Sequence, residues 1–101
     1  MQISGKVIVV TGAASGIGKA MCQRFARDGA AAVIAADLDA SGARKIAEEI
    51  QHQTRSVAVT LDACNESQVA LFIEQVIEKF GHIDLQCCNV RRQTMTIGWL
   101  G

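Results

Sequence analysis

The feature that most constrains this chain is a glycine-rich segment at residues 11–18, with the sequence TGAASGIG. It follows the apolar run VIVV at residues 7–10 without a break and leads directly into a segment with helical spacing. Glycines let the backbone approach an anion closely, and the first free N–H groups of a helix point at it with the positive end of the helix dipole behind them. The segment therefore predicts a strand, a tight turn and a helix start that together hold a phosphate. A purely structural turn is the alternative at this point.

Apolar runs typical of buried strands recur along the chain. We expect strands at residues 6–10, 31–36, 56–61 and 83–88. Because these runs are continuous rather than alternating, they indicate a parallel sheet covered on both faces.

Amphipathic segments separate the expected strands, and each carries a helix-start or helix-stop signal. Asp39 or Ser41 can cap the second helix, and Asn65 with Gln68 resembles a capping box before the third. The expected apolar stripes are Ile17, Ala20, Met21 and Phe25 in the first helix, Ala43, Ile46, Ala47 and Ile50 in the second, and Val69, Phe72, Ile73, Val76, Ile77 and Phe80 in the third.

The order β-α-β-α-β-α-β predicts an α/β fold, a partial Rossmann-like doubly wound parallel sheet. Right-handed crossovers give the strand order 3-2-1-4, with the first two helices on one face and the third on the other. That third helix alone should leave apolar strand side chains partly bare. We expect residues 1–89 to form this dinucleotide-binding half-domain and residues 90–101 to form a divergent, irregular tail. Nucleotides bind such sheets at the carboxyl ends of the strands, where the glycine turn lies.

The composition excludes several classes of partner. Ten acidic residues balance ten basic ones, so no electrostatic footprint for nucleic acid or an acidic membrane exists. The longest apolar stretch, residues 30–36, is far shorter than the roughly 18 residues of a membrane span. Residues 1–5 lack the pattern of a secretory signal. We therefore expect a cytoplasmic protein without nucleic-acid or membrane partners.

The four cysteines, at positions 22, 64, 87 and 88, lack the Cys-x-x-Cys spacing of a metal site and have no histidine placed to complete one. We expect no metal, and we expect small buried thiols that stay reduced.

Asp37 marks the cofactor that the turn would hold. It lies about 20 residues beyond the turn, at the end of the second expected strand, where a carboxylate accepts hydrogen bonds from adenosine ribose hydroxyls. No Arg or Lys stands at the positions that could contact the 2′-phosphate of NADP, which are Ala13, Ala14, Ser15 and Leu38. Their absence from these positions favours NAD over NADP. A role for Asp37 as a mere helix cap is the weaker alternative, because Asp39 and Ser41 are better placed.

These features resemble the short-chain dehydrogenase/reductase family, whose signature Thr-Gly-x-x-x-Gly-x-Gly matches residues 11–18. The resemblance covers residues 6–85 and implies that Asp62 lies near the adenine, with Ala63 beside it. It also implies that Asn89 stands in the family's Asn-Asn-Ala-Gly segment, where Cys88, Val90 and Arg91 depart from the pattern. The expected cofactor-binding residues are Gly12, Ser15, Gly16, Ile17, Gly18, Asp37, Leu38, Asp62, Ala63 and Asn89.

The resemblance also implies a catalytic Ser, Tyr and Lys in which Tyr is the acid/base. The chain has no tyrosine, so we expect no catalytic residue in it and an NAD-binding portion of an oxidoreductase that is incomplete for catalysis. Two alternatives remain at this point. One is a non-catalytic nucleotide-binding or decoy module that associates with a full-length relative, and the other is a nonfunctional truncation product.

Overall fold

The computed structural model describes residues 2–89, in which four strands alternate with three helices. The strands are β1 (Val7–Thr11), β2 (Ala32–Asp37), β3 (Arg55–Thr60) and β4 (Leu85–Cys88), and the helices are α1 (Gly16–Arg27), α2 (Ala40–Ile50) and α3 (Glu66–Phe80). The strands pair in parallel in the order β3-β2-β1-β4. The predicted fold class and strand order are therefore confirmed.

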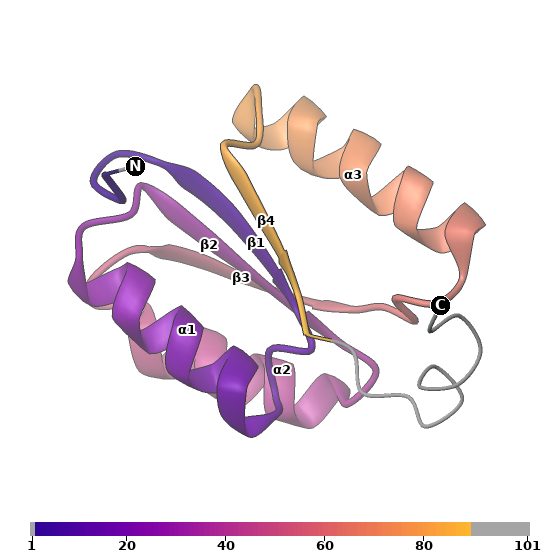
Figure 1. Cartoon of the computed structure of the whole chain (residues 1–101), viewed down its shortest axis with the longest axis horizontal. Helices are drawn as coiled ribbons and strands as arrows, with labels where there is room; N and C mark the ends of the chain where they lie inside the picture. Colours follow the sequence, from indigo (N-terminus) through magenta and orange to yellow (C-terminus); the bar gives the residue numbers. More distant parts are fainter. Residues whose placement is uncertain (1, 90–101) are drawn as a thin grey trace, which may run out of the picture.

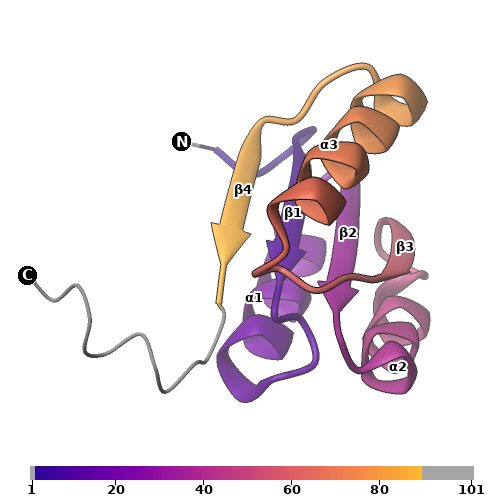
Figure 2. The ribbon, with the colours of Figure 1, turned by 90° about the vertical axis from the view of Figure 1, so that its right-hand side faces the viewer.

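The helices form two layers around the sheet. Figure 1 shows α1 and α2 together on one side and α3 on the opposite side, and Figure 2 shows the same separation after a quarter turn. The predicted placement of the first two helices on one face and the third on the other is correct. Because all the strands pair in parallel, their carboxyl ends lie at one edge of the sheet.

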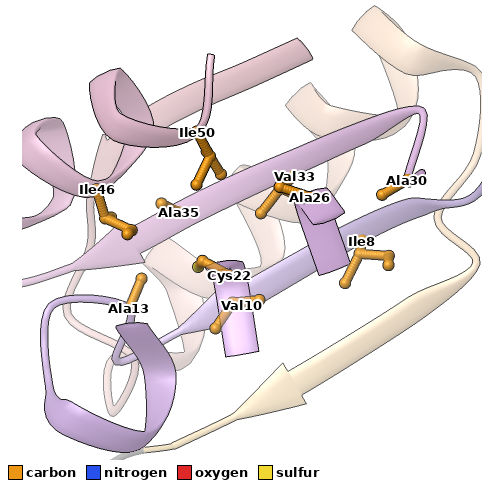
Figure 3. Close-up of a cluster of buried hydrophobic side chains, with 10 residues drawn as sticks. All are labelled: Ile8, Val10, Ala13, Cys22, Ala26, Ala30, Val33, Ala35, Ile46 and Ile50. Carbon is orange, nitrogen blue, oxygen red and sulfur yellow. The ribbon is translucent and has the colours of Figure 1, made fainter. Parts of the chain in front are cut away.

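The core between the sheet and the α1/α2 layer is drawn in Figure 3. Val10 and Val33 point into it from β1 and β2, next to Cys22 and Ala26 of α1, and Ile46 and Ile50 of α2 belong to the same buried cluster. Burial of an aliphatic side chain of this size stabilises the fold by about 1.5–3 kcal/mol. The apolar stripe predicted for the second helix is thus confirmed.

The opposite face is covered by α3 alone among the described elements. Val9 and Ile34 are 0% and 1% exposed there, beneath Phe72 and Val76. The expectation of bare strand side chains is therefore wrong for β1 and β2. It holds in part at β3, where the valines on this face are half-buried.

The apolar stripe predicted for the first helix is the main error. Ile17 is 69% exposed, whereas Gly18, Cys22 and Ala26 are the buried residues of α1. These three lie four residues apart on one face, and their small side chains bring the helix close to the sheet. Small residues that allow close approach, rather than the largest hydrophobic ones, therefore form the buried face of α1.

The helix caps agree with the sequence in part. The Asp39 carboxylate accepts a hydrogen bond from the Gly42 N–H at 2.9 Å, so Asp39 rather than Ser41 caps α2. Asn65 caps α3 by accepting from the Gln68 N–H at 3.1 Å. The Gln68 side chain does not return this bond, as a capping box requires, but accepts from the Asp62 N–H at 3.0 Å.

Asp84 joins the segment before β4 to the start of β1. Its carboxylate accepts a hydrogen bond from the Val7 N–H at 2.8 Å, and its own N–H donates to the Val7 carbonyl at 2.9 Å. The Val7 N–H lowers the pKa of Asp84 from its ordinary value of 3.8, and His82 and Lys6 lower it further. The ionised carboxylate therefore favours the folded state.

We predict an acid limb of stability that depends on Asp84. Because its folded-state pKa lies below its unfolded value, its contribution is complete above about pH 4 and is lost as the pH falls through the folded-state pKa. The free energy of unfolding of Asp84→Ala, measured by urea denaturation from pH 6 to pH 2.5, should fall less steeply in acid than that of the wild type. Asp28→Ala, which removes an exposed carboxylate paired with Arg24, is the matched control and should keep the wild-type slope. Equal slopes for Asp84→Ala and the wild type would contradict this role.

Candidate functional site

The glycine turn is held by close backbone packing. Gly12 has φ of 73°, and a Cβ built on it would overlap the carbonyl of Asn89. A Cβ on Gly18 would overlap the carbonyl of Gly12. Gly16 is different, because a Cβ there would meet nothing within 4 Å. Two glycines of the motif are thus required by the fold, and the third faces open space where a ligand can approach.

The amino end of α1 presents free backbone donors. The Ser15 hydroxyl donates to the Gly12 carbonyl at 2.7 Å, and its side chain makes no capping bond to the helix. The N–H groups of the first helical turn have no intrahelical acceptor, and the helix dipole places positive charge at them. This end of α1 and the open side of Gly16 together fit a phosphate or pyrophosphate.

Asp37 lies beside this turn because β2 pairs with β1 up to Thr11 and Ala36. One carboxylate oxygen accepts from the Ala14 N–H at 2.9 Å, and the other accepts from the Asp39 N–H at 2.9 Å. Each oxygen has a second lone pair that can accept from a hydroxyl. The carboxylate is therefore fixed against the glycine turn and remains able to bind a ribose.

Asp62 and Ala63 follow β3 at the same edge of the sheet, and both are half-buried. The Leu61 N–H donates to the Asp37 carbonyl at 3.0 Å, which joins the ends of β2 and β3. The Asp62 carboxylate accepts from the Cys64 N–H at 3.0 Å, so Asp62 shapes its own turn. Its place near an adenine stays a prediction.

Asn89 closes the other side of the turn, directly after β4. Its N–H donates to the Thr11 carbonyl at 3.1 Å, and its side-chain amide lies 3.4 Å from the Met21 sulfur. Asn89 is also the residue whose carbonyl excludes a side chain at Gly12. The predicted departures at Val90 and Arg91 lie outside the described residues.

All ten predicted cofactor-binding residues thus lie at one edge of the sheet, after the strands or in the first turn of α1. They come from four segments that the parallel pairing brings together: residues 12–18, 37–38, 62–63 and 89. Leu38 is 67% exposed beside Asp37 and can cover a ligand from the solvent side. Cofactor contact by these residues stays a prediction.

The structure adds residues that the sequence did not indicate. A cavity of about 380 Å³ lies between α1 and α2, and Lys19, Lys45 and Glu49 contribute its charges while Ala14 and Gly42 form its wall beside the glycine turn. Both lysines belong to exposed helical positions, and nothing in their spacing relates them to each other. Only the packing of α1 against α2 brings them to one cavity.

The cysteines differ in their surroundings. Cys22 is buried, and burial raises the pKa of its thiol to about 12, so it stays protonated. Burial also raises the pKa of Cys87, which is half-buried. Cys64 and Cys88 are exposed, so the expectation that all four are buried is wrong for these two.

Within residues 2–89, no cluster of His, Cys, Asp and Glu side chains is arranged to hold a metal ion. No helix in this part of the chain is long and apolar enough to cross a bilayer.

Comparison with known proteins identifies the family. The sequence model described as short chain dehydrogenase matches residues 6–95. This match covers most of the chain and includes every residue of the predicted site. The chain therefore belongs to the short chain dehydrogenase family, and the resemblance inferred from its motifs is confirmed.

Curated relatives and solved structures agree with this assignment. An uncharacterized oxidoreductase of Bacillus subtilis, YuxG, is 42% identical over 91 residues, which are 87% of this chain and 13% of that protein. The 3-oxoacyl-[acyl-carrier-protein] reductase FabG of Thermotoga maritima is 37% identical over 90 residues, covering 88% of this chain and 36% of that protein. A 3-ketoacyl-(acyl-carrier-protein) reductase from Brucella melitensis, complexed with NADH, superposes with a TM-score of 0.74 at 39% identity, covering 83% of this chain and 34% of that one. The L-sorbose reductase of Gluconobacter frateurii, complexed with NADPH and L-sorbose, gives a TM-score of 0.81 at 29% identity over 91% of this chain and 36% of that one. The chain thus spans about a third or less of the length of these proteins.

We predict that the three motif glycines separate into two groups on substitution. Gly18→Ala should lower the free energy of unfolding by roughly 1–3 kcal/mol, because the added methyl group overlaps a backbone carbonyl. Gly12→Ala should lower it by roughly 2–5 kcal/mol, because alanine is also disfavoured at the positive φ of this position. Gly16→Ala should change it by less than about 1 kcal/mol, since the site is open and helical. Urea denaturation of the three variants measures the difference. A cost at Gly16 equal to that at Gly18 would contradict this division.

Proposed function

We propose that this chain is the nicotinamide dinucleotide-binding part of a short-chain dehydrogenase and that it prefers NAD to NADP. The observation that carries the proposal is the Asp37 carboxylate, fixed by the Ala14 N–H at 2.9 Å beside the free amino end of α1. A nicotinamide dinucleotide supplies the hydride acceptor or donor of an oxidoreductase when it is bound.

Each part of the dinucleotide is assigned to the residues whose chemistry suits it. The open side of Gly16 and the first N–H groups of α1 would hold the pyrophosphate. Asp37 would accept hydrogen bonds from the adenosine ribose, and Asp62 and Ala63 would lie by the adenine. Family membership supports a nicotinamide dinucleotide as the ligand, and the proteins matched include one complexed with NADH and one with NADPH. The preference for NAD rests on the negative charge of Asp37, which repels a 2′-phosphate.

We predict that the charge of Asp37 sets the cofactor preference. Asp37→Asn keeps the size of the side chain and removes the charge, so it should weaken NAD binding about tenfold, the size expected for a hydrogen bond to a charged group. NADP binding should weaken less or improve, because the repulsion of its 2′-phosphate is lost. Titration calorimetry with NAD and with NADP measures both affinities.

Asp28→Ala is the matched control for this experiment. It removes one carboxylate at the far end of α1, next to Arg24, and should leave both affinities within twofold of the wild type. An unchanged ratio of NAD to NADP affinity in Asp37→Asn would refute the proposed preference. A wild-type chain without saturable binding of either dinucleotide would refute the cofactor role and favour the nonfunctional product.

We further propose that the 101-residue chain by itself transfers no hydride. It contains no tyrosine, the residue that the family resemblance makes the acid/base. The chain mixed with NADH and a panel of small ketones should therefore show no loss of NADH absorbance above the rate of a heat-denatured sample. Turnover that disappears in Gly16→Ala but persists in Asp28→Ala would overturn this proposal. Co-purification with a full-length relative would favour the decoy alternative.

A further inference from the structure

Four residues around the glycine turn form a closed ring of contacts. The Asp37 carboxylate accepts from the Ala14 N–H and from the Asp39 N–H, each at 2.9 Å. The Asp39 carboxylate accepts from the Gly42 N–H at 2.9 Å, and Gly42 packs back against Ala14. The ring therefore links the carboxylate at the end of β2 to both the glycine turn and the first turn of α2.

Gly42 is the member of this ring with no room for a side chain. A Cβ built on it would lie 2.6 Å from the Ala14 Cβ and 2.7 Å from an Asp39 carboxylate oxygen. The Ala14 Cβ is attached directly to the backbone that donates to Asp37, so it cannot move without displacing that N–H. The Asp39 side chain is held by its own capping bond to the Gly42 N–H.

Helix propensity does not explain this glycine. Gly42 lies within α2, and its φ is not in the left-handed region that favours glycine. Glycine in a helix is disfavoured relative to alanine, so local preference alone would place alanine here. The contact with Ala14 is the feature of its surroundings that requires the small residue.

We propose that Gly42 is a positioning residue for the dinucleotide site: by letting α2 seat directly on Ala14, it holds the Asp37 carboxylate in the orientation that receives the adenosine ribose. This inference rests on the proposed function and extends it to a residue that touches no cofactor. A methyl group at position 42 pushes α2 and the glycine turn apart. The Ala14–Asp37 hydrogen bond then lengthens, and the carboxylate loses its fixed place.

The first test is amide hydrogen exchange in the full 101-residue chain without any dinucleotide. In Gly42→Ala, the Ala14 amide should exchange at least tenfold faster than in the wild type, while the Val9 amide in the centre of β1 keeps its wild-type rate. Ser41→Ala, at the neighbouring exposed position of α2, is the matched control and should leave the Ala14 rate unchanged. An unchanged Ala14 rate in Gly42→Ala overturns the inference.

The second test measures affinity for NAD and NADP by calorimetry. A general loss of stability would weaken both by the same factor, whereas displacement of Asp37 should lower the ratio of NAD to NADP affinity about tenfold, the effect of losing a hydrogen bond to a charged group. Ser41→Ala should keep the wild-type ratio. A wild-type ratio in Gly42→Ala overturns the inference.

The double variant Ala14→Gly/Gly42→Ala tests the contact itself. It removes the methyl group of residue 14 that the new methyl group of residue 42 would meet, so it should restore most of the wild-type ratio. If Gly42→Ala does not fold, folding and a wild-type ratio in the double variant support the inference, and failure of the double variant overturns it. Failure of the wild type to bind NAD refutes the proposed function alone, because exchange at the Ala14 amide still decides whether Gly42 holds the Ala14–Asp37 bond.

Discussion

The structure depends on backbone contacts in which carbonyl groups take the space of missing side chains. The carbonyl of Asn89 lies where a Cβ of Gly12 would be, and the carbonyl of Gly12 lies where a Cβ of Gly18 would be. These contacts stack the end of β4, the turn after β1 and the first turn of α1 on one another. The amino end of α1 is thereby placed at the edge of the sheet by close backbone packing. The geometry of the candidate site consequently depends on glycines that have no side chain.

The orientation of the Asp37 carboxylate is fixed by backbone groups at the same closely packed turn. A carboxylate at the end of a strand can turn in many directions, but this one accepts backbone N–H groups from Ala14 and Asp39. It is therefore part of the wall of the turn, and each of its oxygens keeps a lone pair that can accept from a ligand hydroxyl. The interpretation of Asp37 as a ligand residue and the alternative of a helix-capping residue are not exclusive: Asp39 caps α2, and Asp37 anchors the turn.

The sheet and the edge carrying the site could be predicted from the sequence because both follow from patterns that are local. Continuous apolar runs indicate buried parallel strands, and the glycine motif and Asp37 each follow such a run directly. The rest of the buried face of α1 could not be predicted in this way, since Cys22 and Ala26 carry small side chains while the larger Ile17 is exposed. The cavity shared by Lys19 and Lys45 also had no local signal, because it exists only where α1 packs against α2.

The two edges of the sheet carry out separate tasks. At the amino edge, the Asp84 carboxylate accepts from the Val7 N–H and lies away from the candidate site. Its charge therefore helps to hold the start of β1 beside β4. At the carboxyl edge, Asp37 performs a similar backbone contact but lies next to the open amino end of α1. The same chemistry, a carboxylate accepting a main-chain N–H, therefore occurs at both edges, and at the carboxyl edge it lies within the candidate site. What distinguishes the surroundings of Asp37 is the positive end of the α1 dipole together with the open space at Gly16, both of which lie beside it.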